Sequence, residues 1–303
     1  MSKLAILLPC YNEEVTIQSV VKDFRNVFPD ADIYVFDNNS RDATARIAKD
    51  AGAIVVPSRR QGKGNVVRHM FRDVDADFYI MADGDATYPA EAAPELLKTL
   101  QQNNSDMVVG MRLQHFTGKS FRKFHRLGNR LITGTIRILF NVKIEDVLSG
   151  YRVFSKGFVK AIPLRSEGFE IETELTLQAV AKGFRIQEVP INYGERPEGS
   201  FSKLSTYSDG WVILRSIFFI LKDYKPFFFF GSLAVFLACC SLLSGYAPIL
   251  DFVTTGLVPH LPRAVLAAAL AIMSFVSFAV GLILETVNRY HNENFLLFRK
   301  LLS

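Results

Sequence analysis

The sequence has little cysteine and tryptophan: three of its 303 residues are Cys and one is Trp. Cys10 lies near the start, and Cys239 and Cys240 are neighbours in an apolar run, so the three form no disulfide framework. No Cys-x-x-Cys pair is present, which excludes a zinc site of that type. We therefore expect a reducing compartment. No secretory signal peptide is expected, because Pro9 and Glu13 interrupt the first apolar stretch.

The sequence also lacks two common nucleotide-binding loops. It contains neither a Walker loop nor a G-x-G-x-x-G motif, which excludes a P-loop NTPase and a typical dinucleotide-binding dehydrogenase. A disordered or collagen-like chain is excluded as well, because 12% of the residues are aromatic and the 19 Gly and 12 Pro follow no period. The net charge of +5 fits a nucleic-acid partner and fits an anionic inner leaflet equally well.

Two long uncharged runs stand near the C-terminus, at about residues 227–250 and 264–284. Each exceeds the roughly 18 residues that indicate a transmembrane helix. The connecting segment carries one Asp and one Arg, whereas Lys and Arg are frequent on the two outer flanks. The positive-inside rule therefore predicts an inner-membrane hairpin with both termini in the cytoplasm. The alternative is a buried hairpin in a soluble protein.

The first 200 residues show a different pattern, in which short β-rich runs alternate with helical patterns. This alternation predicts an α/β domain with a doubly wound parallel sheet. The expected strands are 4–8, 33–36, 53–56, 78–82 and 106–110, and the expected helices are about 13–28, 43–50, 65–72 and 90–100.

A third segment joins these two regions. From Trp211 to Leu221 the apolar residues share one helical face, which predicts a helix lying in the membrane interface. The alternative is a helix packed only on the catalytic domain. We thus expect three parts: a cytoplasmic catalytic domain at 1–204, an interface helix at 205–226, and a two-span hairpin with a short tail at 227–303.

Acidic and amide residues follow three of the expected strands, at the edge where ligands of such sheets bind. The clusters begin at Asn12, Asp37 and Asp83. Any one of them could be an ordinary turn, but three on one edge predict a site. Asp83 and Asp85 flank a glycine and can face a hard divalent cation such as Mg²⁺ or Mn²⁺, which commonly bridges substrate phosphates. The pattern therefore indicates a diphosphate donor held through a metal.

Six motifs occur in an order that resembles a known family. They are P-C-Y-N-E-E, D-N-N-S-R-D, G-K-G, D-G-D, D-V-L-S-G-Y-R and R-P-E-G-S-F-S-K-L. This set resembles the family 2 glycosyltransferases of GT-A fold. The two C-terminal runs resemble its polyprenyl-phosphate branch, which includes dolichyl-phosphate mannose synthases and bacterial relatives of the GtrB type.

The resemblance implies a role for each strand-end residue. Asp37 is expected to contact the base or ribose, while Asp83 and Asp85 hold donor and metal, with Asp85 preferred as the direct ligand. Two departures stand out: Asn38 replaces a common second Asp, and Thr87 replaces a frequent Gln. The expected donor-binding residues are Pro9, Tyr11, Asn12, Glu13, Asp37, Lys63, Asp83, Gly84, Arg196 and Lys203.

Basic residues between 112 and 130 suggest a site for the acceptor phosphate. Arg122, Arg126 and Arg130 stand at i, i+4 and i+8, which makes one basic helical face. The alternative is a solvated face or a patch for anionic lipid. Because guanidinium groups match phosphate geometry, we expect Arg112, Arg126 and Arg130 to bind the acceptor phosphate together with Ser200, Arg126 also being catalytic.

Asp146 opens the D-V-L-S-G-Y-R motif and is a candidate catalytic residue. In the wider family an Asp near this position can act as a base, whereas a phosphate acceptor is already an anion at neutral pH and can attack without first losing a proton. Asp146 then orients the acceptor or braces Arg152, and Glu170 and Glu172 could serve the same pocket. Arg196, Ser200 and Lys203 lie in a Gly-containing loop that could close over the diphosphate; the alternative is a basic juxtamembrane loop.

These observations predict an inverting, metal-dependent transferase. It would move a sugar from a nucleotide diphosphate, UDP-linked, to a polyprenyl phosphate, undecaprenyl phosphate in a bacterium, at the cytoplasmic membrane face. A homo-oligomer such as a tetramer is expected, and nucleic acid is not. The alternatives are a processive polysaccharide synthase, which would have more spans and a Q-x-x-R-W motif, and a non-enzymatic nucleotide-sugar-binding membrane protein. The sugar is not specified by the sequence.

Overall fold

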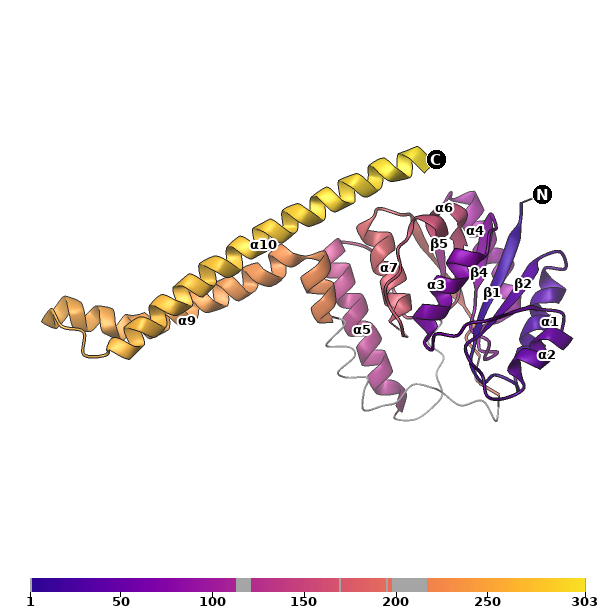
Figure 1. Ribbon diagram of the computed structural model, residues 1–303, viewed down its shortest axis with the longest axis horizontal. Helices are drawn as coiled ribbons and strands as arrows, with labels where there is room; N and C mark the ends of the chain where they lie inside the picture. The colour runs from indigo at the N-terminus through magenta and orange to yellow at the C-terminus, as the bar shows by residue number, and fades with distance from the viewer. Residues whose placement is uncertain (1, 113–120, 169, 195, 198–216, 303) are drawn as a thin grey trace. The chain divides into compact units, whose positions relative to one another are not determined.

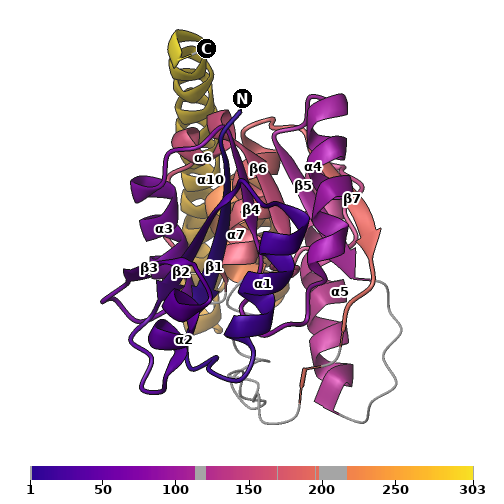
Figure 2. The same ribbon diagram turned by 90° about the vertical axis from the view of Figure 1, so that its right-hand side faces the viewer.

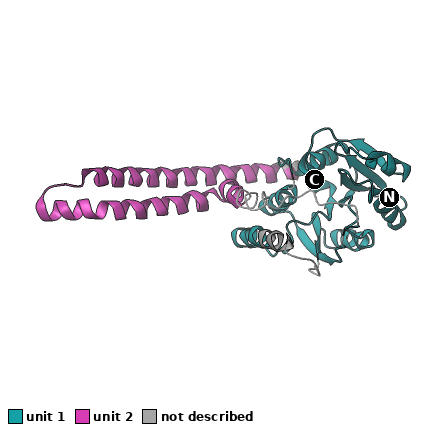
Figure 3. Ribbon diagram, turned by 90° about the horizontal axis from the view of Figure 1, so that it is seen from below, with its two compact units in different colours: residues 1–213, 303 teal, residues 214–302 magenta. Residues whose placement is uncertain are grey.

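The computed structural model describes residues 2–112, 121–168, 170–194, 196–197 and 217–302. The chain forms two compact units, residues 1–213 and residues 214–302 (Figure 3). The predicted boundary at 204, Trp211 and most of the expected interface helix fall outside the described residues.

The first unit is built around one seven-stranded sheet among the described residues (Figure 1). The strand order is β3-β2-β1-β4-β6-β5-β7, and β6 runs antiparallel to both of its neighbours. The five expected strands are present. The predicted parallel pairing is confirmed for β1 to β4 and for β5 with β7, but the sheet is mixed, because β6, a short strand without a periodic pattern, inserts antiparallel between β4 and β5. The strands are β1 Leu4–Cys10, β2 Asp32–Asp37, β3 Ile54–Pro57, β4 Phe78–Met81, β5 Met107–Arg112, β6 Arg152–Ser155 and β7 Ile186–Ile191.

Helices cover both faces of this sheet (Figure 2). The apolar residues of α1, α2 and α4 belong to one core cluster on one face, while α3, α6 and α7 lie on the other. The helices of this unit are α1 Ile17–Val27, α2 Thr44–Asp50, α3 Lys63–Asp73, the 3₁₀ turn η1 Ala90–Ala92, α4 Ala93–Gln102, α5 Phe121–Phe140, α6 Lys156–Ala161 and α7 Ile171–Ala181.

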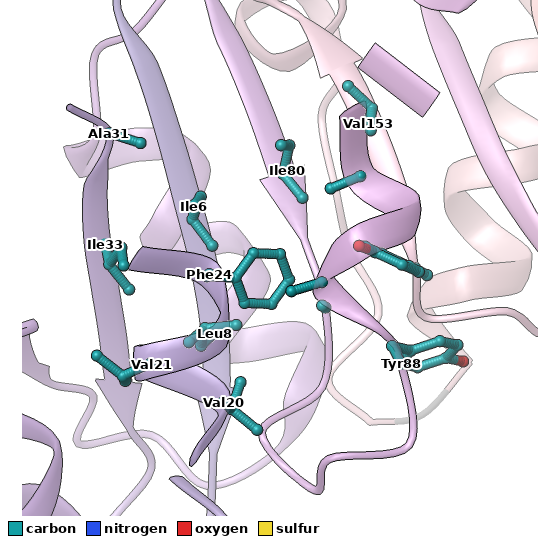
Figure 4. Packing of buried hydrophobic residues seen from close by; sticks show 14 of the residues in the cluster. Ile6, Leu8, Val20, Val21, Phe24, Ala31, Ile33, Ile80, Tyr88 and Val153 are labelled. Carbon is teal, nitrogen blue, oxygen red and sulfur yellow. The ribbon is translucent and has the colours of Figure 1, made fainter. Parts of the chain in front are cut away.

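Helix α1 shows how the sequence pattern produces this packing. Its buried residues Ile17, Val20, Val21 and Phe24 follow helical spacing and face the sheet. The Phe24 ring lies among strand residues of the core and meets the edge of Tyr151, with 6.4 Å between the ring centroids (Figure 4). The helix starts four residues later than expected, which leaves residues 13–16 as a turn at the end of β1. That turn carries part of the site.

The second unit is a helical hairpin preceded by a short π-helical turn. The turn η2 spans Ile220–Tyr224, α9 spans Pro226–Thr255, and α10 spans Leu261–Leu302. Pro226 opens α9, and Gly256 ends it with a left-handed backbone (φ 70°). Both helices are long and apolar enough to cross a membrane, and little of either apolar segment is buried within the protein.

Small residues and hydroxyls hold the hairpin together. Ser241, Ser274 and Ser277 each donate a hydrogen bond of 2.7–2.9 Å to a backbone carbonyl of the opposite helix. A side chain added at Gly245 would lie 3.3 Å from Ala267. Close contacts of this kind are typical of helices that associate in lipid, where a hydrophobic driving force between helices is lacking.

Candidate active site

The three strand-end clusters meet at one edge of the sheet, because β2, β1 and β4 are adjacent and parallel. The Thr16 hydroxyl donates a 2.7 Å hydrogen bond to the carbonyl of Gly84, which joins the turn after β1 to the loop after β4. Gly84 lies against the Cys10 sulfur with no space for a side chain. Gly84 therefore lets two of the clusters approach each other.

Hydrogen bonds between backbone groups and side chains fix the ends of β1 and β2. Asn12 has a left-handed backbone (φ 54°), its N–H donates to Ser40 Oγ at 2.9 Å, and its Oδ1 accepts from the N–H of Arg41 at 2.8 Å. The N–H of Glu13 donates to Thr44 Oγ1 at 2.8 Å. The Asn12 side chain is thus engaged in tying the two loops together. Of the neighbouring candidates, Pro9 and Tyr11 are half-buried.

Asn38 connects the end of β2 to the loop that leads into α3. Its amide group donates to the carbonyls of Ser58 at 2.9 Å and Arg60 at 2.7 Å, and its Oδ1 accepts from the N–H of Gly62 at 2.8 Å. An aspartate here could not donate to the two carbonyls. The departure from the family pattern therefore has a structural reason: Asn38 positions residues 58–62, directly before Lys63.

Asp37 is the exception on this side, because one of its oxygens is unused. Its Oδ2 accepts a 3.3 Å hydrogen bond from the N–H of Ser40. Its Oδ1 is buried and has no hydrogen-bond partner in the described part of the chain. A buried acceptor without a partner is costly, so this atom calls for a donor from outside the protein.

Asp83, at the end of β4, belongs to a partly buried triad of charges, in which its own side chain is 27% exposed. Lys63 Nζ lies 2.5 Å from Asp83 Oδ1 and 2.6 Å from Glu172 Oε1 of α7. Burial pulls the pKa of Lys63 down, but the two carboxylates outweigh burial and raise it above its ordinary value. A side chain on Gly150 would lie 2.8 Å from Asp83 Oδ2, so the D-V-L-S-G-Y-R segment packs directly on the triad.

Asp85 is almost fully enclosed, with a side chain only 3% exposed. Its Oδ1 accepts from the hydroxyl of Thr87 at 2.6 Å and from the N–H of Thr87 at 3.2 Å. Its Oδ2 lies 2.6 Å from Nη2 of Arg196. A buried carboxylate needs a cationic partner, and Arg196 supplies it. Thr87, the other departure from the family pattern, orients the carboxylate instead of adding a ligand.

The chemistry of Asp83 and Asp85 fits a divalent cation. Within the described ranges no three His, Cys, Asp or Glu side chains are grouped so as to hold a metal ion. Two carboxylates are sufficient where phosphate oxygens and water complete the coordination, as is usual for Mg²⁺. The Arg196 guanidinium provides the positive charge that such an ion would provide to Asp85.

Asp146 is committed to Arg112, and this pair forms the far side of the site. Arg112 Nε donates to Oδ2 of Asp146 at 2.7 Å, and its Nη2 donates to Oδ1 at 2.8 Å. Burial lowers the pKa of Arg112, but its hydrogen bonds to Asp146 outweigh burial and raise the pKa above its ordinary value. Glu188 of β7 accepts from the backbone N–H of Asp146 at 2.9 Å. The guanidinium also lies over the ring of Tyr193, 5.5 Å from its centroid.

Arg152 has a structural role that the sequence did not indicate. It is fully buried, and its guanidinium donates to the carbonyls of Ser149 at 2.9 Å and Val147 at 2.7 Å. Asp146 gives Arg152 no hydrogen bond among the described residues, because both of its oxygens bond to Arg112, and it acts on Arg152 through its negative charge. Burial lowers the pKa of Arg152 to about 10, well above neutral pH.

The remaining candidates lie apart or outside the described structure. Arg130 is exposed on α5, and Glu170 is exposed before α7. Arg126 lies in α5, but its side chain is outside the described structure, and so are Ser200 and Lys203.

Tyr88 is a site residue that sequence reasoning missed. It is buried and accepts a 2.9 Å hydrogen bond from the N–H of Gly150. Its ring contacts those of Tyr151 and Tyr193. Its position three residues after Asp85 is the signal that could have identified it.

Comparisons with known proteins agree with this arrangement. A family model described as Glycosyl transferase family 2 matches residues 5–162. Glycosyltransferase AglJ of Haloferax volcanii is 36% identical over 230 residues, which cover 76% of this chain and 75% of that protein. Undecaprenyl-phosphate mannosyltransferase of Micrococcus luteus is 27% identical over 219 residues, which cover 67% of this chain and 88% of that protein.

The solved structures agree on the fold. Glucosyl-3-phosphoglycerate synthase from Mycobacterium tuberculosis, crystallised with Mn²⁺, uridine diphosphate and phosphoglyceric acid, superposes with a TM-score of 0.61 at 20% identity. The match covers 73% of this chain and 78% of that one, and it supports a GT-A-like fold. The match to the family model and the 36% identical relative agree with a strand-end site of paired carboxylates and cations. This chain therefore belongs to glycosyl transferase family 2 and is a glycosyltransferase.

Proposed function

We propose that this enzyme transfers a sugar from a nucleoside diphosphate, UDP in particular, to a polyprenyl phosphate at the cytoplasmic face of a membrane. The single observation that carries the proposal is the pair Asp83 and Asp85 at the end of β4, each neutralised by a cation, Lys63 and Arg196. A carboxylate pair balanced by basic side chains suits a ligand that brings both a metal ion and a diphosphate.

The donor is proposed to lie along the ends of β2, β1 and β4. The buried Oδ1 of Asp37 accepts a hydrogen bond from the ribose or base. Asp83 and Asp85 would hold Mg²⁺ or Mn²⁺, which when bound stabilises the negative charge of the leaving diphosphate. Arg196, which neutralises Asp85 in this structure, is then able to serve as a counter-charge for the diphosphate.

The acceptor is proposed to enter from the β5 side, where Arg112 is buried and oriented by Asp146. An oxygen of the acceptor phosphate attacks C1 of the sugar, the bond from C1 to the donor phosphate oxygen breaks, and the nucleoside diphosphate leaves. Attack opposite the leaving group inverts the configuration at C1. No base is required, because a phosphate monoester is already ionised at pH 7. Asp146 therefore positions Arg112.

The membrane assignment is supported by the two apolar helices and by relatives named after lipid phosphates. Both α9 and α10 are long enough to span a bilayer. A dolichyl-phosphate hexose transferase of Haloferax volcanii is 29% identical over 214 residues, which cover 92% of that protein. We propose that the hairpin holds the first unit where a soluble donor meets a lipid acceptor, with both chain ends cytoplasmic.

A donor screen tests this proposal. The full chain, purified in detergent, is mixed with undecaprenyl phosphate, Mn²⁺ and one nucleotide sugar at a time, and the lipid product is identified by mass spectrometry. We expect one UDP-sugar to give a glycosyl phospholipid of inverted anomeric configuration, and the Asp85→Asn variant to give none. Transfer without a lipid phosphate, or a product with retained configuration, would refute the proposal.

A further inference from the structure

A cavity in the first unit is lined by none of the residues proposed above to bind the donor, the metal ion or the acceptor. It has a volume of about 890 Å³ and lies between α3, the loop after β3, α6 and the segment that follows α6. We name it the α3 groove. Its lining is basic at the more exposed rim and apolar at the buried floor. Arg59, Arg60, Arg68, Arg72 and Lys160 supply the charge, and Phe71, Val159, Ile162 and Leu164 supply the buried carbon surface.

Carboxylates neutralise only part of this charge, and none of them lines the groove. Arg72 pairs with Asp73 at 2.5 Å, and Lys160 lies 3.7 Å from Asp75. Three further cations, Arg59, Arg60 and Arg68, pair with no carboxylate of the described residues. The groove therefore carries a surplus of three positive charges, whose mutual repulsion an anion would relieve.

The three surplus arginines are attached to a fixed framework. The side-chain amides of Asn38 and Asn39 donate to the carbonyls of residues 58, 59 and 60 at 2.7–2.9 Å. These hydrogen bonds fix the position of the backbone from which the Arg59 and Arg60 side chains extend. Fixed attachment lowers the entropy that a ligand must remove when it binds.

Helix α3 presents the third arginine in a defined orientation. Asn65, Arg68, His69 and Arg72 share one face of the helix at i, i+3, i+4 and i+7. The guanidinium of Arg68 donates to the side-chain oxygen of Asn65 and, at 3.4 Å, to the carbonyl of Arg165. Both partners are neutral, so they orient the fork of Arg68 and leave its charge uncompensated.

We propose that the α3 groove binds a phosphate-bearing anion at a site separate from the sugar-transfer site. Guanidinium groups bind phosphate oxygens through paired, charge-assisted hydrogen bonds. The volume exceeds that of a single phosphate and falls in the range of about 300–1,000 Å³ typical of small-molecule sites. Phe71 and Leu164 on the floor suit a carbon portion next to the phosphate. A phospholipid headgroup and a soluble phosphate compound share this chemistry.

The test compares a groove variant with a charge-matched control in the full chain. The groove variant is Arg59→Gln/Arg60→Gln/Arg68→Gln. The control removes three exposed lysines that do not line the groove: Lys22→Gln/Lys49→Gln/Lys98→Gln. Both variants lose three positive charges, so only the location of the loss differs. Thermal unfolding of both variants verifies that they are folded.

Two probes separate the two sources of phosphate. Binding of inorganic pyrophosphate and of dihexanoyl phosphatidylglycerol is measured by calorimetry in an uncharged detergent with EDTA, with dihexanoyl phosphatidylcholine as the zwitterionic reference. We expect the groove variant to bind at least one anionic probe on the order of tenfold more weakly than the control, with binding to the wild type falling as salt rises. If the groove variant loses affinity for the phosphatidylglycerol probe alone, the ligand is a lipid headgroup. If it loses affinity for pyrophosphate, the ligand is a soluble phosphate compound. Equal isotherms for both variants with both probes would overturn the proposal.

Discussion

The two sides of the site are built from different interactions. On the β1–β2 side, hydrogen bonds that involve no cationic side chain hold the loops: the side chains of Asn12 and Asn38 and the carboxylates of Glu14 and Asp42 bond to backbone groups. On that side one buried acceptor, Oδ1 of Asp37, lacks a hydrogen-bond partner among the described residues. On the β4–β5 side, the carboxylates of Asp83, Asp85 and Asp146 each pair with a cation.

Because of this difference, we expect the β1–β2 side to stay fixed when ligands bind and the β4–β5 side to rearrange. Hydrogen bonds between backbone groups and nearby side chains of the protein do not depend on a ligand, so the β1–β2 side is preformed. An ion pair can exchange one partner for another of the same charge, so the β4–β5 side can respond to a metal ion or a phosphate. Arg196 shows this best, because its side chain is 32% exposed while that of Asp85 is enclosed.

The largest expected effect is on the charged side. Asp85→Asn removes the charge that a divalent cation requires, and it should lower the transfer rate about a hundredfold or more, which corresponds to about 3 kcal/mol of transition-state stabilisation. Steady-state kinetics at saturating Mn²⁺ measure it. Asp30→Asn, at an exposed turn, is the control. A rate within a few-fold of the wild type would remove the metal role from Asp85.

Arg196→Gln should distinguish the role of Arg196 as a counter-charge for the diphosphate from the role of Asp85 as a metal ligand. We expect turnover to fall about tenfold, because a positive charge near the diphosphate is lost. In the absence of nucleotide, Mn²⁺ should bind about threefold to tenfold more tightly, because Asp85 no longer pairs with a guanidinium. Electron paramagnetic resonance of free Mn²⁺ gives this affinity. Unchanged Mn²⁺ binding would show that the pair does not compete with the ion.

Asp37→Ala tests the role of Oδ1 of Asp37, the buried acceptor on the β1–β2 side that has no hydrogen-bond partner among the described residues. Loss of a hydrogen bond to a charged group should weaken binding of uridine diphosphate by about 1.5–3 kcal/mol, roughly tenfold or more. Mn²⁺ binding without nucleotide should be unaffected, since Asp37 lies on β2. Calorimetry with each ligand separates the two effects. An equal loss of both affinities would contradict the division into two sides.

Asn38→Asp should act on stability more than on chemistry. In the variant, a carboxylate oxygen would replace the amide NH₂ that donates to the carbonyls of Ser58 and Arg60, and both carbonyls would lose their hydrogen bonds. We therefore expect the free energy of unfolding to fall by about 1–3 kcal/mol. Thermal unfolding followed by circular dichroism measures the change. Asn39→Asp, at an exposed position with fewer contacts, provides the comparison and should cost less.

The smallest effect is expected in the hairpin. Ser277→Ala removes one hydrogen bond to the carbonyl of Phe230, and hydrogen bonds of this kind between membrane helices average about 0.6 kcal/mol. Transfer activity should stay within twofold of the wild type, because Ser277 is not part of the strand-end site. A large loss of activity with an unchanged unfolding temperature would mean that the hairpin contributes to the reaction itself.

Local patterns in the sequence specify the repeating parts of this protein. Alternating apolar runs specified the five predicted strands, and helical spacing specified the buried face of α1. Length and lack of charge specified the two long helices. Because parallel strands of one sheet end at a common edge, the Asn12, Asp37 and Asp83 clusters could be assigned to one site. These features are local, or follow from a general rule of sheet topology.

The pairing of the charged side chains, in contrast, is known from the folded chain alone. Arg196 reaches Asp85, Lys63 bridges Asp83 and Glu172, and Arg112 takes both oxygens of Asp146. The partners are far apart in the sequence and carry no periodic signal. The antiparallel insertion of β6 brings the segment from Asp146 to Gly150 to the same edge. Ion pairs between distant residues depend on how the whole chain folds, so no local pattern predicts them.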